Sequence, residues 1–298
     1  MKKIILIVTS DPDSINFEII KKSLFFFKKK IKNKYIFIGR NNIIFNNLKK
    51  RKNIGFVFIK KSNDTKKYLS KCFNKAFELL KSKKAHALIN LPLNKKNLPK
   101  KFCGFTEYIS DYFKLKNKET MLLFNHKFSV CPNTTHIPLK KVHLFLNKEK
   151  IINNINNINF FYKKFIGIKK PSIGLMGLNP HNGIDMKKNN EEKNTIIPAI
   201  NIAKKNGIKI FGPLSPDTAF NKIKINKFNS LIGNYHDQVL PTFKYINNFN
   251  AINITLGLPF LRVSLDHGTG KDIKGKNKAK PDSFLYALNF FEKYSNKI

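Results

Sequence analysis

Short runs of apolar residues alternate with longer polar and amphipathic stretches along most of the chain. Ile4–Val8 is a continuous apolar run, which is typical of a strand that is covered on both faces. Tyr35–Ile38 and Phe56–Ile59 have the same character. Because segments with helical spacing lie between such runs, the pattern predicts an α/β protein with a largely parallel sheet.

Helical spacing is clear in several of the intervening segments. Asp64 is a candidate cap for a helix whose apolar residues fall on one face. A second helix is expected around Ile151–Ile158, and a closing helix from about Asp282. Glu191–Ala203 also has helical character, but Pro198 indicates that this helix starts later than its first polar residues.

The remaining apolar runs extend the predicted sheet. Met121–Phe124 and Phe128–Val130 follow each other so closely that they are expected to pair, in an antiparallel manner. Neither an internal repeat nor a separating linker is evident. The 298 residues, 42% of them hydrophobic, are enough for the core of one large α/β domain or of two lobes. The other expected strands are Ala87–Ile89, Ile173–Met176, Ile208–Phe211, Leu231–Ile232 and Ile252–Leu256.

The charge of the chain is extreme, with a net value of +39 and a pI of about 10.1. Such a charge is compatible with a nucleic-acid-binding protein, whose basic residues should then form one localised patch. Here the lysines are dispersed, and lysine, asparagine, isoleucine and phenylalanine, which have AT-rich codons, are all abundant. Mutational bias is therefore favoured over a nucleic-acid partner.

Neither the N-terminus nor the cysteines indicate export. The apolar run Ile4–Val8 is too short for a signal peptide or a membrane span. Cys72, Cys103 and Cys131 are far apart and odd in number, and no CxxC motif occurs. A cytoplasmic protein with no membrane partner is expected.

Three of the seven histidines share a context that suggests chemistry. His136, His181 and His236 each lie at or just after the end of an expected strand. Ligand sites of open α/β sheets gather at the carboxyl ends of strands, and imidazole is a common ligand of catalytic zinc. Spacing alone does not force the three together, so a loop or supporting role for each histidine stays open.

Several familiar catalytic motifs are missing from the sequence. It contains no phosphate-binding P-loop and no G-x-S-x-G nucleophile elbow. The first expected strand is not followed by G-x-G-x-x-G, so a nicotinamide cofactor would have to be bound by something other than a Rossmann motif.

Long motifs nevertheless identify a family that the chain resembles. TTHIPL, GLNPHNG, GPLSPDTAF, YHDQVLP and NITLGLPFLRVSLDHGTG occur in the order and approximate spacing of the 4-hydroxythreonine-4-phosphate dehydrogenases of pyridoxal 5′-phosphate biosynthesis. GFTEYISDYF, ALINLPLNKK and TSDPDSINFEII resemble further segments of that family. The similarity extends over nearly the whole chain.

The resemblance implies a fold, a site and a partner. The fold is expected to be two-lobed α/β/α, like that of isocitrate and isopropylmalate dehydrogenases, without a Rossmann dinucleotide motif. It would form one dehydrogenase domain, 1–298, of two packed α/β lobes with the active-site cleft between them. The family's three metal-binding histidines match His136, His181 and His236. The family is a homodimer whose active sites are shared between its subunits. Its substrate-binding residues match Thr106, Lys244, Asn253 and Arg262.

The resemblance also implies the reaction. The substrate would be 4-phosphooxy-L-threonine, oxidised with NAD, or with NADP, to a β-keto acid that decarboxylates to 3-amino-2-oxopropyl phosphate. One divalent metal (Zn, Mg or Co) would assist. Asp217, Asp237 and Lys244 are the candidate catalytic residues. Asp217, Asp237 and Asp266 are candidates to orient the histidines or to transfer a proton, and the general base among these three acids stays open.

Three departures from the family pattern bear on the site. Phe105 replaces a histidine that contacts the substrate, and phenylalanine offers no hydrogen bond to an anion. Ser10, Ser14 and Asn16 replace glycines of the opening turn, and Val239 replaces another glycine. Two alternatives therefore stay open: a dehydrogenase of another hydroxy-acid phosphate, and a drifted remnant of low activity.

Overall fold

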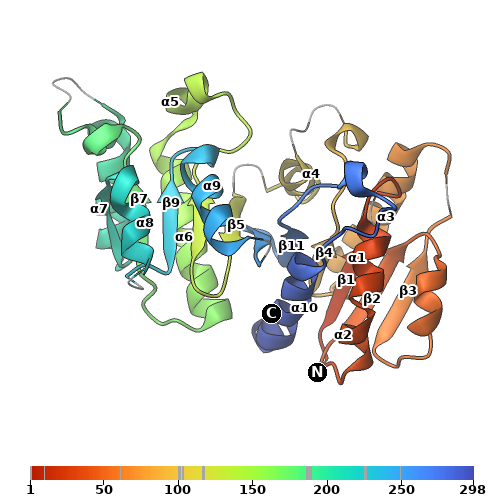
Figure 1. Ribbon diagram of the computed structural model, residues 1–298. Helices are drawn as coiled ribbons and strands as arrows, with labels where there is room; N and C mark the ends of the chain where they lie inside the picture. Colours follow the sequence, from red (N-terminus) through yellow and green to blue (C-terminus); the bar gives the residue numbers. More distant parts are fainter. Residues whose placement is uncertain are drawn as a thin grey trace. The chain divides into compact units, whose positions relative to one another are not determined.

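Strands and helices alternate along the chain as the apolar runs predict (Figure 1). The computed structural model describes residues 2–9, 11–60, 62–99, 102, 104–115, 118–185, 190–224, 227–248 and 250–298. The expectations for Ser10 and Cys103 lie outside the described residues. The chain forms two units: unit 1 is Met1–Tyr108, Phe249–Ile254 and Pro259–Ile298, and unit 2 is Ile109–Asn248 and Thr255–Leu258.

Unit 1 is built on a parallel sheet. Its strand order is β3-β2-β1-β4-β11, with β10 next to β11. Each neighbouring pair from β3 to β11 is parallel, as the continuous apolar runs predict. The strands are β1 (Ile4–Val8), β2 (Lys34–Gly39), β3 (Ile54–Phe58), β4 (Ala87–Asn90), β10 (Ile252–Leu256) and β11 (Leu261–Leu265).

Helices cover the sheet of unit 1. The expected cap is present, since Oδ1 of Asp64 accepts hydrogen bonds from the backbone N–H groups of Lys66 and Lys67 at 2.8 and 3.3 Å. The helix that follows, α3, packs on β1 and β2, and α10 packs on β11. The helices are α1 (Asn16–Lys22), α2 (Leu24–Lys28), α3 (Thr65–Lys81), α4 (Phe105–Tyr112), which continues into unit 2, and α10 (Asp282–Tyr294).

The strands of unit 2 lie in the order β5-β6-β9-β7-β8 of the sheet. The expected antiparallel pair is confirmed, because β5 runs antiparallel to β6. From β6 to β8 every neighbouring pair is parallel, so four strands end at one edge of this sheet. The strands are β5 (Thr120–Phe124), β6 (Ser129–Pro132), β7 (Ile173–Met176), β8 (Ile210–Leu214) and β9 (Ser230–Gly233).

One helix of unit 2 begins next to a proline, as the sequence predicts. The α-helix expected near Pro198 starts at Ile197, after a π-helical turn at Glu192–Ile196. Proline fits there because the first turn of a helix does not use its backbone N–H groups. The helices of this unit are α5 (Val142–Phe145), α6 (Lys148–Phe161), α7 (Ile197–Lys205), α8 (Pro216–Lys224) and α9 (His236–Asn247).

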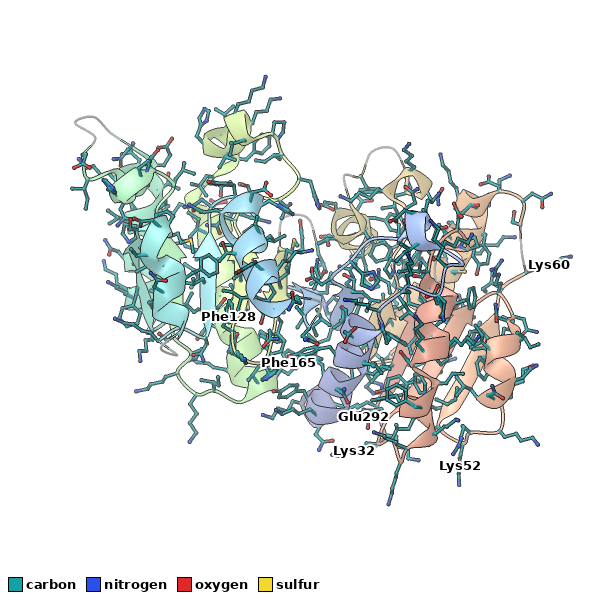
Figure 2. The ribbon with its side chains drawn as sticks, viewed as in Figure 1. Lys32, Lys52, Lys60, Phe128, Phe165 and Glu292 are labelled. Carbon is teal, nitrogen blue, oxygen red and sulfur yellow. The ribbon has the colours of Figure 1, made fainter. Side chains whose placement is uncertain are left out.

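The lysines that dominate the charge are spread over the surface. Lys32, Lys52 and Lys60, all exposed, belong to separate segments of unit 1 (Figure 2). Cys72 and Cys131 are buried free thiols. Within the described ranges, no helix combines the length and the apolar character that crossing a bilayer requires.

Candidate active site

The carboxyl-terminal edge of the sheet in unit 2 carries all three predicted metal ligands. His136 lies in the loop after β6, His181 in the loop after β7, and His236 at the start of α9, just after β9. Because β6, β9 and β7 are adjacent and parallel, their following loops lie at the same edge. Asp217, in the first turn of α8, follows β8 at this edge.

Two of the histidines lie close together. The ring centroids of His136 and His236 are 6.2 Å apart. This is close to the roughly 5–6 Å expected for two imidazoles that share one ion with metal–nitrogen bonds of about 2.0–2.1 Å. Nδ1 of His236 lies 3.1 Å from Oδ1 of Asp237, so Nε2 is the nitrogen directed away from the carboxylate. Asp237 is therefore placed to orient His236.

His181 has its own carboxylate partner. Its Nδ1 lies 3.0 Å from Oδ2 of Asp185, one helical turn later in the chain. The hydrogen bond to Asp185 raises the pKa of His181, and Asp217 adds a smaller attraction. A hydrogen bond from Ser215 lowers the pKa of Asp217, so this acid is ionised at neutral pH. Asp185 was not predicted as a site residue, although its position four residues after His181 was a usable signal.

The loop that carries His181 is held in an unusual conformation. His181 and Asn182 have φ values of 49° and 60°, in the left-handed region that few residues other than glycine adopt. The buried Glu192 carboxylate accepts hydrogen bonds from the backbone N–H groups of Leu178 and Asn179 at 2.7 and 2.8 Å. Burial alone would raise the pKa of Glu192, but these hydrogen bonds lower it. Glu192 thus stabilises this loop as an anion.

The three histidines do not form a closed cluster within one chain. Among the described residues, no three His, Cys, Asp or Glu side chains are grouped so that they could hold a metal ion. His181 and His136 are exposed and His236 is partly exposed, so all three can be reached from outside. Their imidazoles are donors that suit zinc and similar divalent ions, and in this respect the residues present fit such an ion.

Lys244 lies on the same helix as His236. It occupies the last turn of α9, about 12 Å further along the helix axis at a rise of about 1.5 Å per residue. Its side chain is exposed. The helix therefore presents an imidazole at one end and an ammonium group at the other.

Unit 1 carries the other predicted substrate residues, and two of them are in contact. Arg262 is a buried residue of β11. Its Nε donates to Oδ1 of Asn90 at 2.6 Å, and its Nη1 donates to Oγ1 of Thr106 at 3.3 Å. Burial lowers the pKa of Arg262 to about 9, so the guanidinium is still charged at neutral pH. Asn90, the last residue of β4, was not predicted as a site residue.

Phe105 lies against this guanidinium. The Cζ atom of Arg262 is 5.0 Å from the centroid of the Phe105 ring, within the range of a cation–π interaction. Phe105 is itself buried in an aromatic cluster, with ring centroids 4.5 Å from Phe73 and 5.8 Å from Tyr108. Phe105 therefore supports Arg262 through packing and the face of its ring.

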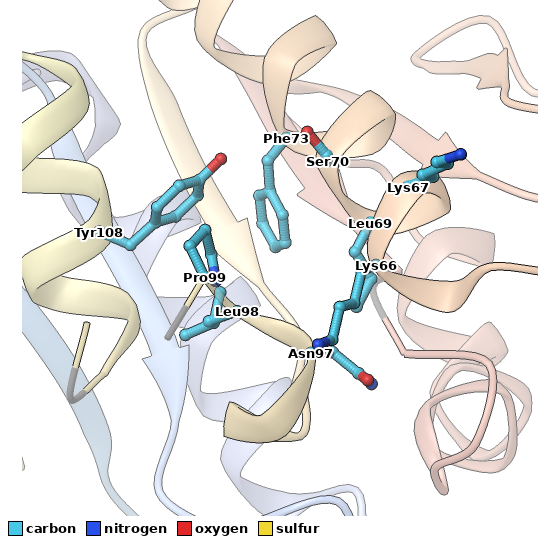
Figure 3. A pocket seen from close by; sticks show the side chains of 9 residues that line it. All are labelled: Lys66, Lys67, Leu69, Ser70, Phe73, Asn97, Leu98, Pro99 and Tyr108. Carbon is cyan, nitrogen blue, oxygen red and sulfur yellow. The ribbon is translucent and has the colours of Figure 1, made fainter. Parts of the chain in front are cut away.

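A cavity of about 250 Å³ lies beside the aromatic cluster in unit 1 (Figure 3). Phe73 and Tyr108, which contact Phe105, also line this cavity, together with Leu98 and Pro99. Its remaining lining comes from the start of α3 and from Asn97. None of the predicted site residues lines it.

Asn253, in β10, presents an unsatisfied acceptor. Its Oδ1 is buried and, among the residues that the structure describes, has no hydrogen-bond partner. A buried polar atom without a partner is costly, and a bound ligand that donates a hydrogen bond would remove that cost. Asn253 is thus suited to the substrate-binding role that the resemblance implies.

The opening turn retains a defined structure without its glycines. The carboxylate of Asp11, which is fully buried, accepts hydrogen bonds from the backbone N–H of Asp13 at 2.9 Å and that of Asn94 at 2.9 Å. The side chain of Asn16 donates to the carbonyls of Thr9 and Pro92 at 2.9 and 2.8 Å. Side-chain hydrogen bonds therefore fix the turn.

Val239 is accommodated by a neighbouring glycine. It is fully buried in α9 and lies above Gly233, where an added Cβ would come within 2.5 Å of Cγ1 of Val239. The glycine that remains at position 233 thus leaves room for the side chain at position 239.

The fold and the edge site together define a class of protein. The isocitrate dehydrogenase of Methylococcus capsulatus superposes on the chain with a TM-score of 0.54 at 10% identity, covering 97% of this chain and 85% of that one. The two-lobed α/β fold of the isocitrate and isopropylmalate dehydrogenases, expected from the sequence, is confirmed. The chain thus belongs to the class of α/β proteins that share this two-lobed fold.

Within that class the family is also clear. The family described as pyridoxal phosphate biosynthetic protein PdxA matches residues 7–291, and the chain belongs to this family. A 4-hydroxythreonine-4-phosphate dehydrogenase of Sulfurihydrogenibium sp. (strain YO3AOP1) is 46% identical over 209 residues, which cover 69% of this chain and 64% of that relative. The match thus spans less than two thirds of that relative's length.

Two further relatives complete the comparison. The crystal structure of the 4-hydroxythreonine-4-phosphate dehydrogenase of Klebsiella pneumoniae superposes with a TM-score of 0.79 at 26% identity, covering 97% of this chain and 98% of that one. A D-threonate 4-phosphate dehydrogenase of Pectobacterium atrosepticum is 34% identical over 223 residues, 73% of this chain and 67% of that relative. The family therefore includes relatives named for two different substrates.

Proposed function

We propose that the chain oxidises 4-phosphooxy-L-threonine with NAD, assisted by a divalent metal, in pyridoxal 5′-phosphate biosynthesis. The observation that carries the proposal is the alignment of His136, His181 and His236 on one edge of three adjacent parallel strands. Membership of the PdxA family supports the substrate, since a 46% identical relative is named 4-hydroxythreonine-4-phosphate dehydrogenase. The product, a β-keto acid, would lose carbon dioxide to give 3-amino-2-oxopropyl phosphate.

Each site residue is assigned a role that its chemistry allows. A divalent ion at His136, His181 and His236 would supply Lewis acidity at the substrate hydroxyl, and a nicotinamide would accept the hydride. Asp237 holds the ring of His236 in place, and Asp185 does the same for His181. Asp217 and Asp237 are ionisable groups near these histidines and remain candidates to take the hydroxyl proton.

The residues of unit 1 suit the anionic parts of the substrate. Arg262 is a buried planar cation, and its contacts with Asn90 and Thr106 fix its orientation. The unsatisfied Oδ1 of Asn253 can accept a hydrogen bond from the substrate's ammonium or hydroxyl group. Lys244 would add a mobile positive charge. The cleft between two lobes remains a prediction.

A homodimer with shared active sites is part of the proposal. Leu139, Leu144 and Phe145 follow His136 in the chain and are 69%, 69% and 53% exposed. Apolar side chains gathered in this way favour contact with another protein surface. A second copy of the chain could then contribute a histidine that completes each metal site, because no three such ligands are grouped among the described residues of one chain.

The test of the function is direct. Purified protein, loaded with zinc, magnesium or cobalt, should reduce NAD when 4-phosphooxy-L-threonine is added, and chelation of the metal should stop the reaction. D-Threonate 4-phosphate is the informative alternative substrate, because a 34% identical relative is named for it and Phe105 alters the substrate region. Faster turnover of that compound would favour the alternative that the chain is a dehydrogenase of another hydroxy-acid phosphate. No turnover of either compound, with the metal bound, would favour a remnant of low activity.

The role of Phe105 can be measured separately. Phe105→Leu removes the ring beneath Arg262, and cation–π interactions of about 0.5–2 kcal/mol correspond to a rise in KM of roughly 2- to 30-fold, with little change in kcat. Phe165→Leu is the matched control: Phe165 is equally buried and lies 4.9 Å from Nζ of Lys164, in unit 2. If the two variants show the same KM for the substrate, Phe105 does not support the substrate-binding arginine.

A further inference from the structure

Buried amide side chains join the three strand ends that carry the histidines. Pro132 of β6 is level with Gly233 of β9, so the next residues, Asn133 and Asn234, face each other where the strands end. Nδ2 of Asn133 donates to Oδ1 of Asn234 at 3.1 Å. Asn133 is 2% exposed and Asn234 is fully buried, so this contact is shielded from water.

Asn234 also joins β9 to the third strand. Its Nδ2 donates to the carbonyl of Met176, the last residue of β7, at 2.9 Å. Its backbone N–H donates to Oε1 of Gln238 at 2.6 Å, and Nε2 of Gln238 donates to the carbonyl of Gly177 at 2.9 Å. Two amides thus connect β9 to the loop that leads to His181.

The loop of His136 is tied to the same asparagine. Both the backbone N–H and the hydroxyl of Thr134 donate to the carbonyl of Asn234, at 3.1 and 2.7 Å. On its other side, Asn133 accepts a hydrogen bond from Nδ2 of Asn154 in α6 at 2.9 Å. Asn234 therefore contacts the segments that lead to His136 and His181, and it precedes His236 by two residues in its own segment.

From this connectivity we infer that Asn234 is a positioning residue for the three histidines. Asn133, Asn234 and Gln238, the amide network, fix the relative positions of the segments after β6, β9 and β7. The β-strands fix only the point at which each loop starts. These side chains fix the path of each loop just after that point. The inference rests on the proposed function for its metal, but the network itself consists of described contacts.

The experiment compares two asparagines at opposite ends of β9, of which Asn234 is fully buried and Asn229 is partly exposed. Asn234→Ala removes the two side-chain hydrogen bonds, to Asn133 and to the carbonyl of Met176, and keeps the backbone bonds to Thr134 and Gln238. Asn229→Ala is the control at the amino end of the same strand, where Oδ1 of Asn229 accepts a hydrogen bond from the backbone N–H of Ser172 at 2.8 Å. Binding of zinc and cobalt alone is measured by calorimetry, and the visible absorption of cobalt reports the ligand geometry.

Loss of residues that orient metal ligands weakens metal binding by roughly 10- to 100-fold. Asn234→Ala is expected to show this loss and an altered cobalt spectrum, whereas Asn229→Ala keeps the wild-type affinity within about twofold even if both lower the melting temperature. Asn133→Ala keeps the hydrogen bond from Asn234 to the carbonyl of Met176, so it should lose less metal affinity. This variant replaces Asn234→Ala in the test if Asn234→Ala does not fold. Wild-type affinity and spectrum in the soluble variants of Asn234 and Asn133 would overturn the inference.

A second measurement needs no metal. Hydrogen–deuterium exchange of metal-free protein should become faster in the segments 133–138 and 177–183 of Asn234→Ala, and stay unchanged there in Asn229→Ala. Unchanged exchange in Asn234→Ala would refute the positioning role. If wild-type protein binds no metal but the exchange rises as expected, the proposed metal chemistry fails while the role of the amide network stands.

Discussion

Replacing His236 with alanine is expected to abolish turnover and to weaken binding of a divalent metal by more than about 100-fold. A catalytic zinc site usually has three protein ligands, and losing one should exceed the roughly 10- to 100-fold effect of losing an outer partner. The side chain of His236 is 38% exposed, so the free energy of unfolding should change little, by about 0.5 kcal/mol or less. Calorimetric titration with zinc and the rate of NADH formation measure the two effects.

His126→Ala is the matched control for this prediction. His126 is exposed and precedes β6, at the opposite end of that strand from His136. This variant should retain both metal binding and activity. Full metal affinity in His236→Ala, or an equal loss in His126→Ala, would show that the metal, if bound, lies elsewhere.

Replacing Arg262 with methionine is expected to raise KM for the phosphorylated substrate by roughly 10- to 150-fold. A hydrogen bond to a charged group contributes about 1.5–3 kcal/mol, and methionine fills similar space without the charge. The same change leaves the buried Oδ1 of Asn90 without its 2.6 Å donor, which should lower the free energy of unfolding by about 1–3 kcal/mol. Steady-state kinetics and denaturant unfolding separate the two contributions.

Asn90→Ala distinguishes substrate binding from stability. It removes the same internal hydrogen bond but keeps the guanidinium and its contact with Thr106. Its stability should fall to a similar degree, while KM rises much less than in Arg262→Met. If both variants raise KM equally, the effect of Arg262 comes from local structure and not from contact with the substrate.

The regular part of the fold was predictable because its signals are local. The run Ile4–Val8 forms β1 as expected, and Asp64 caps α3, since burial and capping leave patterns within a few residues. β11 was missed because Arg262 and Ser264 interrupt its apolar run. The buried arginine of this strand contacts Asn90, Thr106 and Phe105, which are all distant from it in sequence.

The sequence indicated candidate residues for the site but not the residues that hold them in position. His136, His181 and His236 could be chosen from their place after strands and from the family resemblance, and the structure aligns them on one edge. Their grouping around a metal stays a prediction. Glu192 and Asn234 were not identified, because their roles depend on tertiary hydrogen bonds that no spacing reveals.

The opening turn changes how the departures from the family can be understood. Ser14 and Asn16 stand where the family has glycines, and Asn16 is buried and donates two hydrogen bonds. A residue other than glycine restricts the unfolded chain, and at a compatible position this stabilises a protein by about 0.4–1 kcal/mol. At this turn the loss of glycine therefore lowers the chain entropy that folding must overcome. The Oδ1 atom of Asn16 opposes that gain, because it is buried and has no hydrogen-bond partner among the described residues.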